Sequence, residues 1–140
     1  MEYCHLAVLN MQKCTLTLLT VAEGMETRES HTAEMEVNAS SALLRYKESG
    51  TSVCISLRKG EACIEREGEY GMNLPLREGS TTRGALTLSG ASGALDAYTE
   101  RVEYAVKPTG LFFRLQYSLL FDKERQEMRV SGHAKINGEK

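Results

Sequence analysis

The stretch from Leu111 to Ile136 constrains the fold of this chain more than any other. Its first arm places apolar or aromatic side chains at every second position: Leu111, Phe113, Leu115, Tyr117, Leu119 and Phe121. Its second arm alternates in the same way, with apolar or small residues at Met128, Val130, Gly132, Ala134 and Ile136. A period of two over this length indicates two half-buried strands. The charged run at 122–127 is typical of a solvated turn, so the sequence predicts an antiparallel hairpin with one face on a core.

The rest of the chain repeats this alternation in shorter segments. We expect further strands at 14–22, 26–39, 42–47, 51–58, 62–67, 70–76, 83–89 and 95–106. Turn residues separate these segments, and none shows a convincing helical period. Pro75 cannot donate a backbone hydrogen bond, which indicates an edge strand or a bulge at 70–76. Eight to ten sequential strands predict an all-β protein, a single antiparallel up-and-down barrel, because closure of the sheet removes both edges.

The length of 140 residues suggests one domain with a normal core. We expect residues 14–140 to form the barrel and residues 1–13 to form an N-terminal extension or arm. Within this arm, His5–Leu9 is either a short strand or a packed segment.

Charge and hydropathy exclude several classes of partner. The net charge is −2, and the Lys and Arg residues are scattered among Glu, which argues against nucleic acid. No apolar run approaches the ~20 residues of a membrane span, so no membrane association is expected. The apolar run at 15–22 is interleaved with threonine and follows an acidic leader, which differs from a signal peptide. We therefore expect neither a signal peptide nor a membrane span.

The four cysteines form no C-x-x-C pair and do not cluster with histidines as zinc ligands do: Cys4, Cys14, Cys54 and Cys63. A disulfide framework is possible with an even count, but a chain of this size folds without one. We expect four reduced thiols. Cys54 and Cys63 lie at unequal distances from the turn at Gly60, so no bridge between them is expected.

The order and spacing of several segments resemble the YwiB-like family of small bacterial proteins of unknown function. They are Leu43-Leu44-Arg45-Tyr46-Lys47-Glu48, the hairpin around Arg58-Lys59-Gly60, Ile64-Glu65-Arg66-Glu67-Gly68 leading to Met72, the loop Glu78-Gly79-Ser80-Thr81, and Tyr117-Ser118-Leu119-Leu120-Phe121. The resemblance spans about Leu16 to Ile136. It implies a calycin-like, lipocalin-related barrel in a cytoplasmic protein with no established activity, and it supplies no catalytic residues.

No motif for catalysis, metal or cofactor binding stands out. The glycine-rich stretch Ser89–Ala94 is followed by a strand-like segment and not by a helix, so a hairpin turn is favoured over a phosphate site. His31 shares the apolar register of its strand and His133 alternates with charged residues, which is typical of structural or exposed histidines. Glu65, Glu67 and other alternating acids indicate a solvated face. We therefore expect no catalytic residue, no metal and no cofactor.

The barrel interior is the more promising place for a ligand, because small barrels either fill with side chains or hold one small molecule. Six large residues are predicted to face inward and are the candidate ligand-binding residues: Met35, Tyr46, Met72, Phe113, Tyr117 and Met128. They are equally consistent with a filled core. The main hypothesis is a non-enzymatic module, monomeric or homodimeric, that binds a small apolar or amphipathic ligand. The alternatives are an enzyme with a polar cluster at the barrel mouth and a protein–protein interaction module using an exposed strand edge or patch.

Overall fold

The computed structural model describes residues 11–121 and 123–137. Ten strands make up almost all of this part of the chain: β1 (Gln12–Ala22), β2 (Met25–Val37), β3 (Ser41–Glu48), β4 (Thr51–Arg58), β5 (Glu61–Glu67), β6 (Tyr70–Arg77), β7 (Thr81–Leu88), β8 (Ala91–Lys107), β9 (Gly110–Phe121) and β10 (Glu124–Ile136). The described residues contain no helix that is long and apolar enough to cross a bilayer.

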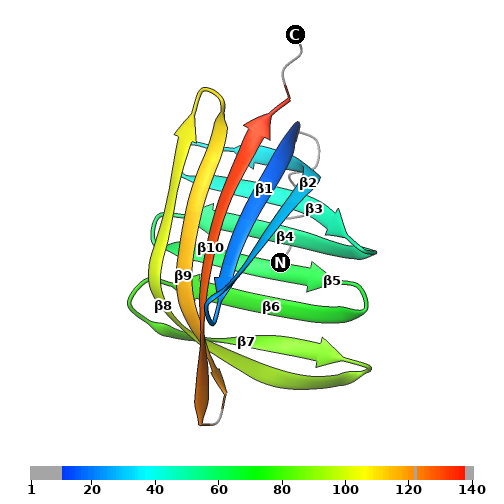
Figure 1. Ribbon diagram of the computed structural model, residues 1–140, viewed down its shortest axis with the longest axis vertical. Coiled ribbons are helices and arrows are strands. Elements are labelled where there is room, and N and C mark those ends of the chain that lie inside the picture. The colour runs from blue at the N-terminus through cyan, green and yellow to red at the C-terminus, as the bar shows by residue number, and fades with distance from the viewer. Residues whose placement is uncertain (1–10, 122, 138–140) are drawn as a thin grey trace.

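Each strand pairs antiparallel with the next one in sequence, and β1 pairs with β10 to close the barrel. Figure 1 shows β8, β9, β10 and β1 running steeply across β3 to β7, so that the two halves of the barrel wall cross and enclose the core. The predicted all-β, up-and-down barrel is thus confirmed, and its ten strands lie within the eight to ten expected.

Two-residue turns set the register of several hairpins. Ser89 and Gly90 both have a positive φ, 50° and 82°, and join β7 to β8. Two consecutive residues with positive φ are the backbone that matches the twist of paired strands, and glycine adopts it without strain. The glycine-rich stretch is therefore a hairpin turn, as predicted.

The hairpin of β9 and β10 contributes a large share of the core. Leu111, Leu115 and Ala134 are fully buried, and Phe113 is 4% exposed. Gly132 pairs with Phe113, and a Cβ on Gly132 would lie only 2.2 Å from the Phe113 ring. The ring therefore covers the backbone of β10, which only glycine permits.

The hydrogen-bonded ladder ends early in two of the strand pairs, β6–β7 and β2–β3. The pairs between β6 and β7 run only from Tyr70 to Asn73 on β6, so Pro75 lies where β7 has already separated and no donor is required. This agrees with the predicted irregularity at Pro75. Between β2 and β3 the pairs end at Ala33 and Tyr46, although β2 begins at Met25. The first half of β2 therefore pairs with β1 alone, and the barrel wall is open beside it.

Residues 1–10 of the arm expected at residues 1–13 lie outside the described residues. The segment His5–Leu9 belongs to this undescribed part. The barrel strand β1 begins at Gln12.

Candidate functional site

The six candidate residues all face the barrel interior. Met35, Tyr46, Phe113 and Tyr117 are at most 7% exposed and belong to the buried core, whereas Met72 and Met128 are partly buried and pack against it. Their inward orientation follows from the strand alternation. Whether they bind a ligand stays a prediction.

The deep part of the interior is filled. Met35 is 1% exposed, and the Phe113 ring packs against Gly132 without space for one additional carbon atom. The larger hollows formed by the described residues open on the outer face, one of about 560 Å³ beside Glu34 and Lys47 and one of about 530 Å³ beside Phe112. These two core residues therefore act as packing, and a ligand has more room elsewhere.

The other four candidates lie towards one end of the barrel. Met72 pairs with Arg66, close to the turn between β5 and β6. Met128 pairs with Tyr117, which lies on β9 shortly before that strand ends at Phe121. The positive charge of Arg66 reaches both Tyr46 and Tyr117, which shows that these strands converge there.

A polar cluster lines the same end of the interior, and we call it the mouth cluster: Glu29, His31, Tyr46, Glu48 and Arg66. His31 Nε2 lies 2.8 Å from Glu29 Oε1, and the carboxylate accepts this hydrogen bond. Arg66 donates to Glu48 Oε1 over 3.2 Å. The side chains of the two acids are about one-third exposed, and those of His31 and Arg66 are 15% and 24% exposed. The cluster is therefore half-buried and still accessible to solvent.

Aromatic rings hold the two nitrogen-containing side chains in place. The rings of His31 and Tyr46 stack with their centroids 4.6 Å apart and 28° between their planes. The guanidinium of Arg66 lies over the ring of Tyr70 at 5.9 Å from its centroid, within reach of a cation–π interaction. Both the imidazole and the guanidinium are thereby restricted to few rotamers.

Burial strongly affects the two phenols near the cluster. It raises the pKa of Tyr46 to about 12 and that of Tyr117 to about 12, because the phenolate would lose hydration, while the charge of Arg66 acts in the opposite direction. At neutral pH both side chains are therefore neutral hydrogen-bonding groups. A general acid or base works best with a pKa near the operating pH, so neither phenol is suited to that role.

A family model described as a domain of unknown function (DUF1934) matches residues 17–131. The chain belongs to this family. The structure is similar to the crystal structure of the ywiB protein from Bacillus subtilis, with a TM-score of 0.81 and 15% identity over 94% of this chain and 98% of that chain. At this identity the likeness concerns the fold. No curated protein matches the chain. The resemblance to the YwiB-like family is confirmed, and the matched residues of this DUF1934 domain include the whole mouth cluster.

The charged members of the mouth cluster in this DUF1934 domain were not among the site residues predicted from the sequence. Arg66 continues the inward register of Ala62 and Ile64, and His31 continues that of Ala33 and Met35. The sequence signal for such a cluster is a charged or polar residue at an inward position, where it follows apolar inward residues of the same strand, and this signal recurs in several strands. Its members come from three strands, so only the pairing of β2 with β3 and the closure of the barrel bring them together.

The cysteines of this DUF1934 domain differ from the expectation of four reduced thiols. Cys14 and Cys63 are free and buried, but Cys54 is disulfide-bonded, so the expectation is wrong for Cys54. Cys54 pairs with Glu65 across the β4–β5 ladder and Cys63 with Ser56, so the two are not opposite one another. The predicted absence of a bridge between Cys54 and Cys63 is confirmed. Spacing in the sequence does not reveal whether a half-exposed cysteine is oxidised.

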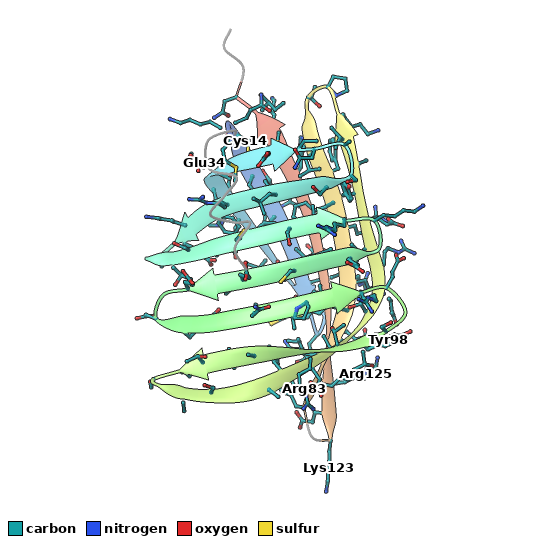
Figure 2. All side chains as sticks on the ribbon, turned by 180° about the vertical axis from the view of Figure 1, so that it is seen from behind. Cys14, Glu34, Arg83, Tyr98, Lys123 and Arg125 are labelled. Atoms are coloured by element: carbon teal, nitrogen blue, oxygen red, sulfur yellow. The ribbon has the colours of Figure 1, made fainter. Side chains whose placement is uncertain are left out.

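Polar groups elsewhere form pairs with structural roles. Arg83 and Asp96 are directly opposite on β7 and β8 and form two hydrogen bonds of 2.9 and 3.2 Å. Figure 2 places Arg83 and Tyr98 at the opposite end of the molecule from Cys14 and Glu34. The Glu78 carboxylate accepts a hydrogen bond from the Val102 backbone N–H (2.9 Å), next to the bulge at Thr99 in β8. The loop at 78–81 therefore stabilises an irregular point of the wall.

Proposed function

We propose that this protein is a non-enzymatic binding module whose small amphipathic ligand occupies the open end of the barrel, as a calycin-like barrel would. The observation that carries the proposal is the combination of the half-buried Arg66–Glu48 pair, two neutral phenols and two partly buried methionines, Met72 and Met128. The methionines are unbranched and change shape easily, so they can move apart for an apolar group. Arg66 and the phenols then offer hydrogen bonds to its polar end.

The arrangement supports binding better than catalysis. Among the described residues of the mouth cluster there is no serine or cysteine beside His31, and the two phenols have pKa values far above neutrality. An enzyme would require titrating groups near the working pH. The cluster instead resembles ligand sites in which a few placed polar groups orient a largely apolar molecule.

An interaction module has one specific observation in its favour. The outer face of β1, β9 and β10 carries the hollow of about 530 Å³, where the rings of Phe112 and His133 stack with centroids 4.1 Å apart. Phe112 is 37% exposed. Strand addition is confined to stretches where a ladder ends early, such as the first half of β2, because the ten described strands otherwise close into a barrel. A second copy of this chain bound at this outer face would make the protein a homodimer, and native mass spectrometry measures that state directly.

The binding proposal is tested with the dye 1-anilinonaphthalene-8-sulfonate, which combines apolar rings with an anionic group. We expect the wild type to bind it saturably and Arg66→Met to weaken this binding by about tenfold or more. Arg83→Met is the matched control, because Arg83 also pairs with an acid but lies on the exposed face of β7. Phe112→Ala is the control for the outer hollow.

Two results would overturn the binding proposal. The first is absence of dye binding and of any retained small molecule in native mass spectrometry of the wild type. The second is equal weakening by Arg66→Met and Arg83→Met. Cooperative unfolding of each variant must be verified, because partly folded proteins also bind this dye.

A further inference from the structure

Three side chains of the mouth cluster converge on one point. Glu29, His31 and Glu48 each offer one ligand atom, and these atoms lie within 4.8 Å of one another. Two carboxylate oxygens and one imidazole nitrogen in this arrangement are a donor set for a divalent transition-metal ion. We propose that the mouth of the barrel binds one such ion through Glu29, His31 and Glu48.

The strand register builds this donor set. Ala33 on β2 pairs with Tyr46 on β3, so two residues further on His31 and Glu48 occupy opposite positions on the same inward face. Glu29 follows two residues away from His31 and shares its face, because side chains alternate along a strand. The ladder between β2 and β3 has ended there, which leaves these side chains free to turn towards one another and leaves an opening for the ion.

Two buried leucines of the neighbouring strand lie beside the donors. His31 pairs with Leu16 and Glu29 pairs with Leu18 on β1, and these leucines are 0% and 5% exposed. Polar ligands beside an apolar shell are typical of metal sites, since the shell limits access of water and strengthens each charge. Two ionised carboxylates beside apolar side chains lose hydration, which is unfavourable unless a cation compensates their charge.

The charges of the cluster leave one carboxylate to be compensated. Arg66 pairs with Glu48, while Glu29 holds a proton of His31 between its Oε1 and the ring Nε2. A divalent ion that binds here takes the place of this proton at Nε2, and the imidazole stays neutral because it then carries its proton on Nδ1. Arg66 and the stacked ring of Tyr46 remain as the outer groups that orient Glu48 and His31.

The donor atoms favour a particular class of ion. Mg²⁺ and Ca²⁺ prefer six or more oxygen ligands, whereas Zn²⁺ accepts nitrogen and oxygen and needs four. Three protein ligands leave at least one position for water or for a donor atom of a small molecule. The first-row dications from Mn²⁺ to Zn²⁺ share this chemistry, and Zn²⁺ is among the tightest of them.

The free thiols are poor competitors for the ion. Burial raises the pKa of Cys14 to about 11 and that of Cys63 to about 11, with Glu34 and Glu65 adding to the respective increases. Only the thiolate is a good metal ligand, so both remain protonated and weakly binding at neutral pH.

Isothermal titration of chelator-treated protein with ZnCl₂ tests the metal site. We expect one saturable Zn²⁺ per chain in the wild type and a higher thermal midpoint in the presence of Zn²⁺. Glu29→Gln and His31→Gln should each weaken binding by about tenfold or more. Glu29 is about one-third exposed, so Glu29→Gln is expected to fold normally.

Matched controls locate the ion. Glu34→Gln changes an acid on the outer face of β2, and His133→Gln changes the histidine on the outer face of β10; both should leave Zn²⁺ affinity unchanged. His5→Gln tests the histidine outside the described residues. The Co²⁺ form should lack the near-ultraviolet charge-transfer band of thiolate ligation.

The metal proposal is overturned by absence of Zn²⁺ binding to the wild type, by unchanged affinity in both Glu29→Gln and His31→Gln, or by loss of binding in His5→Gln. It goes beyond the binding proposal above, and its outcome is separate, since dye binding and Zn²⁺ binding are measured with different probes and different variants.

Discussion

The deep core around Phe113 and the mouth of the barrel lie on different strands of one closed sheet and are packed in different ways. Around Phe113, Leu115 and Gly132 the packing is so close that a single added methyl group has no space. At the mouth, the inward positions of β2, β3 and β5 are occupied by His31, Glu48 and Arg66, which remain 15% to 32% exposed. This fold therefore concentrates its close packing in one region and its half-buried polar groups in another. Substitutions should therefore separate the two.

The largest expected effect is that of Phe113→Ala in the deep core. It removes a ring that is 4% exposed and leaves a cavity, so we expect a loss of about 3–5 kcal/mol in the free energy of unfolding. Phe112→Ala is the matched control, since Phe112 lies on the opposite face of β9 and is 37% exposed. Urea unfolding measures both. Similar, small losses in the two variants would mean that the core around Phe113 is not filled.

The second effect is a loss of stability at alkaline pH. The folded protein raises the pKa of Tyr117 from 10.0 to about 12, so it holds this proton more tightly than the unfolded chain. The stabilisation is complete below pH 10 and is lost as the pH rises through 12. A difference of this size corresponds to about 2–3 kcal/mol.

The variant Tyr117→Phe cannot ionise at this position, and its stability should fall less than that of the wild type between pH 10 and 12. Urea unfolding at pH 7, 10 and 11.5 measures this difference. Tyr46→Phe should behave in the same direction, because burial also raises the pKa of Tyr46 to about 12. Parallel pH profiles for the wild type and Tyr117→Phe would refute the assignment.

A third, smaller effect is expected for Gly132→Ala. Its Cβ would lie 2.2 Å from the Phe113 ring, so the ring or the strand must shift, at a cost of about 1–3 kcal/mol. Gly93→Ala is the control, since nothing lies within 4 Å of its Cβ position and the variant should be neutral or slightly more stable. Thermal unfolding distinguishes the two. If the close contact is the cause, the double variant with Phe113→Leu should recover part of the loss.

The sequence predicts the barrel well because its alternation is regular. The inward positions of β9 and β10 follow directly from the period of two, and the turns at Gly60 and Gly90 lie where glycine is required by a positive φ. Burial of every second residue leaves little freedom for another register, since a shift of one position would expose the whole apolar face. Pro75 likewise lies where its missing N–H costs nothing.

The mouth cluster was harder to predict because its residues are distant in sequence. Each of His31, Glu48 and Arg66 alone looks like a polar residue of a half-exposed strand, and only the closure of ten strands brings them together. The oxidation of Cys54 was also beyond the sequence, because it depends on contacts and not on spacing. The packing of the interior thus follows from the alternation within each strand, whereas the mouth cluster forms only when the strands assemble into the barrel.

The smallest expected effect is that of Arg66→Met at the mouth, and it tests whether the mouth contributes to stability at all. Arg66 and Glu48 are about one-quarter and one-third exposed, so water screens their interaction, and the loss should be about 1 kcal/mol. This loss arises mainly because Glu48 then lacks its partner beside Glu29. The double variant Arg66→Met/Glu48→Leu removes that unpaired charge, and its unfolding free energy should return close to that of the wild type. A loss comparable to that of Phe113→Ala, with no recovery in the double variant, would place the mouth in the stabilising core and remove the distinction between the two regions.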